Sequence, residues 1–203
     1  LDLNQFAINM INVESDIRDN TMDNLMFGIF GLESSNTIQR NVVTLSTPSP
    51  GFGFTRGITL TRPQEAIITN NEIYEGMRGI SIEDVANDFL IEDNDLITSF
   101  YFGGINTRIY IRNAKLDPAE GVILNNDLLI DDAMASTGIH LINTNRINVE
   151  DNEPKPTDNK ILLKKVDGNE VDIAKWLDKA IPHFKQALKV SGSEIAILTR
   201  SAR

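Results

Sequence analysis

The stretch Gly31-Leu32-Glu33-Ser34-Ser35-Asn36-Thr37-Ile38-Gln39-Arg40-Asn41 contains the pattern on which the prediction of the fold depends. It ends in a β-branched residue, Ile38, that is followed after two intervening residues by asparagine. The chain carries six copies of this pattern, with the asparagines at Asn20, Asn41, Asn71, Asn94, Asn126 and Asn152. Successive asparagines are 21, 30, 23, 32 and 26 residues apart, which is typical of a repeat with insertions of variable length.

The residues around each asparagine favour strands over helices. Short apolar runs alternate there with polar residues at a period of two, and five Gly-Ile pairs, at residues 28, 57, 79, 104 and 138, fall between the asparagines. Three such runs make one turn of a solenoid, and stacked turns let every strand pair in parallel with its copies in the neighbouring turns. We therefore predict an all-β coil of parallel strands over residues 1–152.

Asparagine suits the corner between two of these strands. Its side chain tolerates a left-handed backbone and hydrogen-bonds to local main chain, and stacked asparagines can bond to one another. The six asparagines are therefore interpreted as a structural ladder, in preference to ligands for sugar or metal.

On these repeats the chain resembles the right-handed parallel β-helix proteins of pectin-lyase-like architecture, and residues 31–41 look like the repeat of NosD-like periplasmic proteins and of carbohydrate-active β-helices. The resemblance covers about residues 6–152 and implies a right-handed, single-stranded parallel β-helix of about six coils. It implies no single activity, because such proteins include lyases, hydrolases, epimerases, phage tailspikes and non-catalytic cell-surface stalks. The Asp-Pro-His motif of the epimerases is absent, since Asp117-Pro118 is followed by alanine.

Composition narrows the classes of partner. With a net charge of −10 and few Lys or Arg in clusters over the first 150 residues, nucleic acid is not an expected partner. Membrane insertion is not expected either, because no apolar run approaches the roughly 20 residues needed to span a bilayer. The lack of cysteine excludes disulfides but leaves the localisation open, with an extracellular, cell-surface or virion location favoured. We also expect residues before Leu1, or another chain, to cover the first coil.

The pattern changes after residue 152. The polar, proline-bearing residues 153–160 indicate a linker, and residues 161–203 indicate a small α+β module. In this module we predict a strand over 161–166, a helix over 171–190 and a last strand over 194–199. A module of this size rarely supports its own core, so we expect it to cap the coil or to assemble sister chains.

Two variable corners gather aromatic side chains that we predict to contact glycan or a neighbouring subunit. Arginines open the strands that follow two of the corners, and guanidinium groups beside aromatic faces suit sugar rings and acidic sugars. Internal packing of the loops is the alternative. The candidate residues are Phe52, Phe54, Arg56, Arg78, Phe100, Tyr101 and Phe102.

Acidic residues at another corner are the weak catalytic candidates, namely Glu83, Asp84 and Asp88 with Arg112. Paired carboxylates could act as acid and base in glycoside cleavage or hold calcium, although solvated corner residues are the default interpretation. The chain has only two histidines, His140 and His183, so no pair has the spacing of metal ligands. We therefore predict no metal site and no cofactor, with calcium as the exception to test.

Two functional hypotheses remain. The first is a structural or adhesive β-helix, tailspike-like or a surface component, with loop contacts to polysaccharide or to sister subunits. The second is a polysaccharide-active enzyme, a lyase or a glycoside hydrolase, that uses the corner carboxylates and arginine. We favour the first and expect a homo-oligomer or larger assembly, with a trimer as the first guess.

Overall fold

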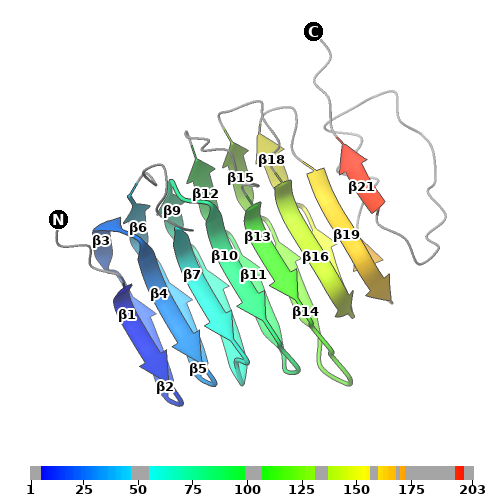
Figure 1. Cartoon of the computed structure of the whole chain (residues 1–203), viewed down its shortest axis with the longest axis horizontal. Coiled ribbons are helices and arrows are strands. Elements are labelled where there is room, and N and C mark those ends of the chain that lie inside the picture. The colour runs from blue at the N-terminus through cyan, green and yellow to red at the C-terminus, as the bar shows by residue number, and fades with distance from the viewer. Residues whose placement is uncertain are drawn as a thin grey trace, which may run out of the picture.

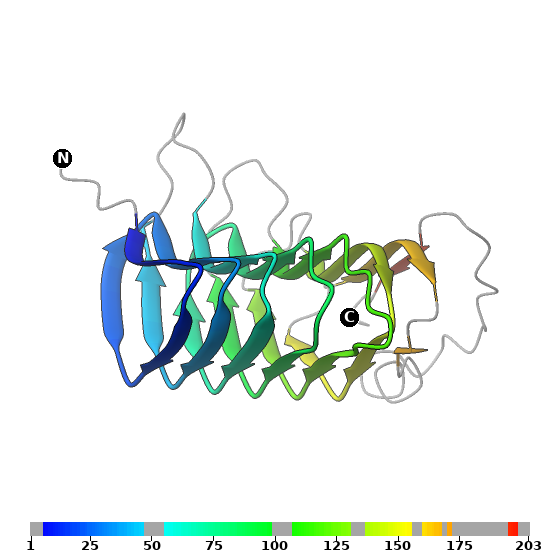
Figure 2. The ribbon, with the colours of Figure 1, turned by 90° about the horizontal axis from the view of Figure 1, so that it is seen from below.

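The computed structural model of the chain is a parallel β-helix built from three sheets, which Figures 1 and 2 show from two sides. It describes residues 6–46, 55–98, 107–130, 137–155, 160–167, 170–171 and 195–198. Each complete coil contributes one strand to each sheet, and neighbouring coils pair in parallel. Over these described ranges, no helix has the length and apolarity needed to cross a membrane.

Sheet A contains, in spatial order, β1 (Phe6–Ile11), β4 (Phe27–Leu32), β7 (Arg56–Thr61), β10 (Arg78–Glu83), β13 (Thr107–Arg112), β16 (Thr137–Asn145), β19 (Lys160–Asp167) and β21 (Ile195–Leu198). Sheet B contains β2 (Glu14–Arg18), β5 (Ser35–Gln39), β8 (Glu65–Thr69), β11 (Phe89–Glu92), β14 (Gly121–Leu124), β17 (Ile147–Glu150) and β20 (Glu170–Val171). Sheet C contains β18 (Glu153–Lys155), β15 (Asp127–Ile130), β12 (Asp95–Thr98), β9 (Glu72–Tyr74), β6 (Val42–Leu45) and β3 (Thr21–Leu25).

The core is made of apolar side chains stacked along the axis of the coil. In sheet B, for example, the register places Ile38, Ile68, Ile91 and Ile123 over one another, and none of the four is exposed to solvent. Their outward neighbours along each strand are more exposed, as the period of two predicts. Because a coil cannot bury its inward face alone, this stacking supplies most of the apolar burial.

The six asparagines form the predicted ladder between sheets B and C. From coil to coil the side-chain Nδ2 donates to the next Oδ1 over 2.8 to 3.0 Å, from Asn20 through to Asn152. Inside the ladder Nδ2 also donates to main-chain carbonyls, as Asn71 does to Ile38 O and Thr69 O. The ladder therefore satisfies main-chain groups that the corner removes from the sheets.

The left-handed backbone at this corner belongs to the residue before each asparagine, where the sequence analysis had placed it on the asparagine itself. These residues have φ between 48° and 58°, and they are Asp19, Arg40, Asn70, Asp93, Asn125 and Asp151. The preceding residue makes the turn while the asparagine points inward to bond, so the turn position accepts residue types as different as Arg40 and Asp93.

Glycine recurs at one inward position near the start of the sheet A strands. A Cβ on Gly57 would lie 2.6 Å from Gly79 O and 2.6 Å from the side chain of Ile73 in sheet C. One coil departs from this rule: Thr107 and Ile109 pair with Arg78 and Ile80, which puts Arg108 where the neighbouring coil has Gly79. The predicted Gly104-Ile105 pair lies outside the described residues. The inward side chains in this coil are those of Ile109 and Ile111.

Arg108 is consequently a fully buried arginine inside the coil. Its Nη2 donates to Gly76 O over 3.3 Å. Burial lowers the pKa of Arg108 to about 10, against the opposing effect of the Glu75 charge.

The coil continues past the expected boundary at residue 152. β18, β19 and β20 pair in parallel with β15, β16 and β17, so one further strand joins each sheet. Main-chain pairing needs no particular side chains, and β18 contains Pro154 at the end of sheet C, where a missing N–H is tolerated. β21 is the last strand of sheet A and pairs antiparallel with β19. The expected helix over 171–190 lies outside the described residues except for Val171, which belongs to β20.

Candidate functional site

The outer face of sheet A carries a group of polar side chains in three adjacent columns, fixed by the parallel register. The first column runs Phe6, Phe27, Arg56, Arg78 and Thr107. The second runs Phe30, Thr59, Ser81, Tyr110 and His140. The third runs Leu32, Thr61, Glu83, Arg112 and Ile142. Neighbouring members of a column stand about 4.8 Å apart along the axis.

Three arginines converge there on one carboxylate, and we call Arg56, Arg78, Arg112 and Glu83 the arginine cluster. Arg112 Nη2 lies 2.8 Å from Glu83 Oε2, whereas Arg78 Nη1 and Arg56 Nη1 lie 3.3 and 3.7 Å from Glu83 Oε1. The Glu83 side chain is 13% exposed and that of Arg112 44%. Three positive charges against one negative charge leave the cluster cationic on a chain whose net charge is −10.

The guanidinium group of Arg78 packs on the ring of Tyr110. Its guanidinium carbon lies 3.8 Å from the centre of the Tyr110 ring, and the Tyr110 ring in turn meets His140 edge to face at 5.4 Å. Burial, and next the positive charge of Arg56, lower the pKa of Arg78. His140 points outward from the coil, as this contact and the burial of Ile139 and Leu141 on either side show.

Several buried polar atoms beneath and within the cluster lack partners. Among the described residues, Arg56 Nε, Thr59 Oγ1 and Ser81 Oγ have no hydrogen-bond partner, although Ser81 is fully buried. Buried polar groups are nearly always paired in folded proteins, so unpaired ones require an explanation.

Aromatic side chains lie on the same face, in the two coils on the N-terminal side of Arg56. The Phe6 ring stacks on Phe27 with centres 4.8 Å apart and meets Phe30 at 5.6 Å. We call these three residues the phenylalanine platform. Phe27 pairs directly with Arg56, so the platform and the arginine cluster are continuous.

Only some of the residues predicted from the sequence meet at this site. Arg56, Arg78, Glu83 and Arg112 come together, although they were assigned to two separate corners. Asp84 and Asp88 bond elsewhere: Asn113 Nδ2 donates to Asp84 over 2.7 Å, and Glu120 N donates to Asp88 over 2.8 Å. The aromatic candidates, which lie outside the described residues, are Phe52, Phe54, Phe100, Tyr101 and Phe102.

The sequence analysis missed Tyr110 and the phenylalanine platform. Both were detectable in principle, because they occupy outward strand positions in the columns that contain Arg56 and Ser81. Finding them required the register between coils, which insertions of variable length conceal.

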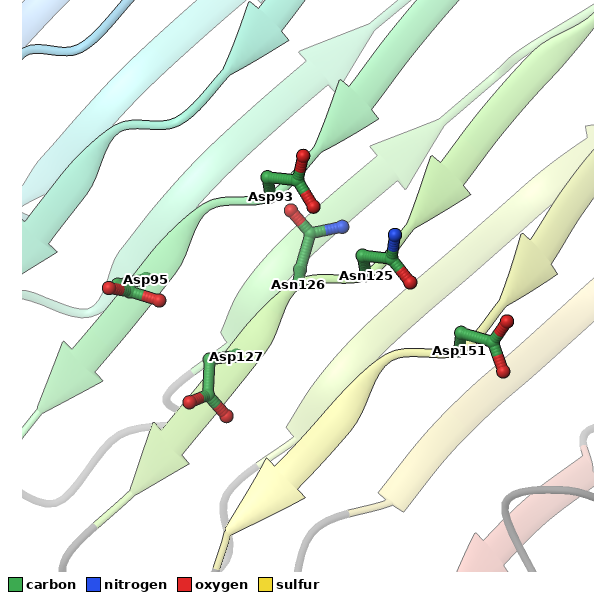
Figure 3. Close-up of a pocket in the computed structure, with 6 residues that line it drawn as sticks. All are labelled: Asp93, Asp95, Asn125, Asn126, Asp127 and Asp151. Carbon is green, nitrogen blue, oxygen red and sulfur yellow. The ribbon is translucent and has the colours of Figure 1, made fainter.

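Two hollows elsewhere are lined by acidic side chains. One, of about 330 Å³, lies beside the asparagine ladder (Figure 3) and is lined by Asp93, Asp95, Asn125, Asn126, Asp127 and Asp151. Another, of about 880 Å³, lies at the corner where the chain passes from sheet A to sheet B and includes Asp88 and Asp117. Within the described ranges no group of three or more His, Cys, Asp or Glu residues is placed to hold a metal ion.

Comparison with known proteins identifies one family. The family model described as "Periplasmic copper-binding protein (NosD)" matches residues 3–114, a little over half of the chain and its first four Asn corners. No curated protein and no solved structure matches the chain.

Proposed function

This chain belongs to the NosD family, and we propose that it is a structural or adhesive β-helix protein that binds glycan through the outer face of sheet A. The observation that carries this proposal is the continuity of the phenylalanine platform with the arginine cluster. Aromatic rings offer flat apolar surfaces to sugar rings, and guanidinium groups bind sugar hydroxyls and carboxylates.

The scaffold supports binding because the site is built on strands. Apart from Phe6 on the edge strand β1, every member of the platform and the cluster sits on a strand paired on both sides, such as β7 between β4 and β10. Side chains on paired strands are held more precisely than side chains on loops, so little order is lost on binding.

Glycan cleavage has less support than glycan binding. Glycoside hydrolysis uses two carboxyl groups on either side of the scissile bond. The arginine cluster contains one carboxylate, Glu83, surrounded by guanidinium groups, and the side chains of Asp84 and Asp88 bond to other residues. A polysaccharide-active enzyme remains the second hypothesis, and it depends on Glu83, Asp84 and Asp88 as the acidic residues.

The family description names copper, and the described side chains do not fit it. Copper prefers thiolate, thioether and imidazole ligands. The chain has no cysteine. Of the four described methionines, Met10 and Met22 belong to the core, whereas Met26 and Met77 are half-buried and lie two coils apart. His140, the histidine within the described ranges, packs against Tyr110. The proposal therefore contains no copper step.

The compartment and the assembly are parts of the same proposal. The family description places its members in the periplasm, and a location outside the cytoplasm suits a glycan-binding rod. A trimer remains our proposal for the assembly, and light scattering of the full chain tests it: a stable monomer would contradict it.

Affinity electrophoresis through gels that contain neutral or acidic polysaccharides tests the binding function. We expect at least one polysaccharide to retard the full chain. Arg78→Gln should reduce the retardation, and the dissociation constant obtained from it should rise about tenfold. The matched control is Arg62→Gln, because Arg62 is 53% exposed and pairs with Glu33 at a corner away from the face.

The same samples separate the two hypotheses. Release of reducing ends or of unsaturated sugar, lost in Glu83→Gln, would establish the enzyme. Migration unaffected by every polysaccharide would contradict glycan binding.

A further inference from the structure

The geometry points to a carboxylate-bearing saccharide as the ligand of the arginine cluster, with Arg56 and Arg78 binding the ligand carboxylate and Glu83 competing with it for them. This inference rests on the proposed glycan-binding function and adds the ligand class and the residue that determines specificity. We propose Glu83 as an internal counter-ion that a ligand partly displaces.

The three arginines share Glu83 unevenly. Its Oε2 is close to Arg112, at 2.8 Å, which is the length of a strong charged hydrogen bond. Its Oε1 accepts a longer hydrogen bond, of 3.3 Å, from Arg78 Nη1 and lies 3.7 Å from Arg56 Nη1, so two guanidinium groups share this one oxygen. Arg56 and Arg78 are therefore the under-neutralised pair.

The two arginines that share Oε1 lie side by side. Arg56 and Arg78 occupy the same position on adjacent strands, about 4.8 Å apart. A carboxylate has two oxygens and can accept from two neighbouring guanidinium groups at once. The Nε of Arg56 is buried, so a ligand carboxylate would meet this arginine at its outer nitrogens, of which Nη1 lies 3.7 Å from Glu83 Oε1.

The aromatic neighbours of Arg56 indicate what kind of molecule carries the carboxylate. In the same column the next residue after Arg56 is Phe27, which stacks with Phe6. A ligand that reaches both must present a carboxylate beside an apolar ring face, as a uronic acid residue within a saccharide does. Inorganic phosphate would use the arginines alone, and a neutral saccharide would use the platform alone.

The exposure of the cluster suits reversible exchange. The side chains of Arg56 and Arg78 are 27% and 21% exposed, so a ligand reaches them without opening the coil. When the ligand binds, Glu83 on β10 keeps its bond to Arg112 through Oε2, whereas Oε1 releases Arg78 and Arg56. The neutral variant Glu83→Gln removes the competing charge and retains the shape of the side chain.

The experiment is isothermal titration of the full chain with trigalacturonate, with the neutral trisaccharide of galactose and with inorganic phosphate. For trigalacturonate we expect Glu83→Gln to raise the affinity several-fold and Arg56→Gln to lower it by about tenfold. Arg112→Gln should lower the affinity as well, because Glu83 loses its nearest partner and turns to Arg78. The control Arg62→Gln should match the wild type, and circular dichroism confirms that each variant is folded.

The outcomes separate this inference from the function on which it rests. Equal affinity of the wild type for the acidic and neutral trisaccharides would overturn the inference and leave glycan binding intact. Phosphate binding as tight as that of trigalacturonate, or a fall in affinity in Glu83→Gln, would also overturn it. If Glu83→Gln fails to fold, an unchanged affinity in Arg112→Gln overturns it instead. Lack of binding to either saccharide by the wild type and by Glu83→Gln would contradict glycan binding itself.

Discussion

At the scale of single residues, the asparagine ladder shows how one side chain organises a corner. Asn71 is fully buried, and its Oδ1 accepts from both the main-chain N and the Nδ2 of Asn41. Its own Nδ2 donates to Ile38 O, Thr69 O and the next asparagine. Removing this side chain leaves the buried main-chain N of Asn41 without its acceptor and takes one partner each from Asn41 Nδ2, Ile38 O and Asn94 Oδ1.

Asn71→Ala should therefore lower the free energy of unfolding by about 3 kcal/mol, because each unsatisfied buried group costs about 1–3 kcal/mol. The matched control is Asn20→Ala at the exposed start of the ladder, where the loss should stay under about 1 kcal/mol. Urea denaturation followed by circular dichroism measures both values. Similar losses in the two variants would show that burial of the ladder does not determine its contribution.

Residue types at the corners were predictable to different degrees. The asparagine positions were predictable because buried amides in a ladder allow no substitute. The left-handed residues before them were not, since exposed side chains as different as Arg40 and Asp93 take that φ. The burial of Arg108 could not be predicted for another reason. Strict alternation from Ile109 and Ile111 places its side chain outward, whereas it lies fully buried at the position that Gly79 has in the neighbouring coil.

At the scale of elements, glycine sets how closely sheet A approaches sheet C. Gly28 and Gly57 repeat the same contacts, with the carbonyl of the next glycine 2.6 Å from the position of a Cβ. Main-chain atoms of a paired strand cannot move aside without breaking the sheet. Gly31, in contrast, faces the end of the flexible Leu60 side chain, at 2.7 Å.

Gly57→Ala should lower the free energy of unfolding by about 2–3 kcal/mol through overpacking. Gly31→Ala is the matched substitution on β4, and it should cost less than about 1 kcal/mol because Leu60 can change rotamer. Thermal and urea unfolding of the two variants measure the difference. A cost for Gly31→Ala equal to that for Gly57→Ala would mean that the side chains resist as firmly as the main chain.

At the scale of the whole molecule, the coil is a one-dimensional stack in which each turn contacts only its neighbours. The coil as far as residue 152 could be predicted because its repeat places like residues in register. Its continuation through β18, β19 and β20 could not, because it consists of main-chain pairing in residues whose composition resembles a linker. The columns of the candidate site were likewise hidden by the unequal lengths of the repeats.

The stack predicts the consequence of shortening the chain from its C-terminal end. A chain that ends at Val171 keeps β18, β19 and β20, whereas a chain that ends at Asn152 leaves β15, β16 and β17 as edges. Each lost main-chain hydrogen bond contributes about 0.5–1.5 kcal/mol, so the shorter chain should unfold at a clearly lower urea concentration. It should also aggregate more readily, because unpaired parallel edges bind other chains. If residues 153–171 were only a linker, the two chains would unfold together, since the last turn would gain nothing from the strands that follow it.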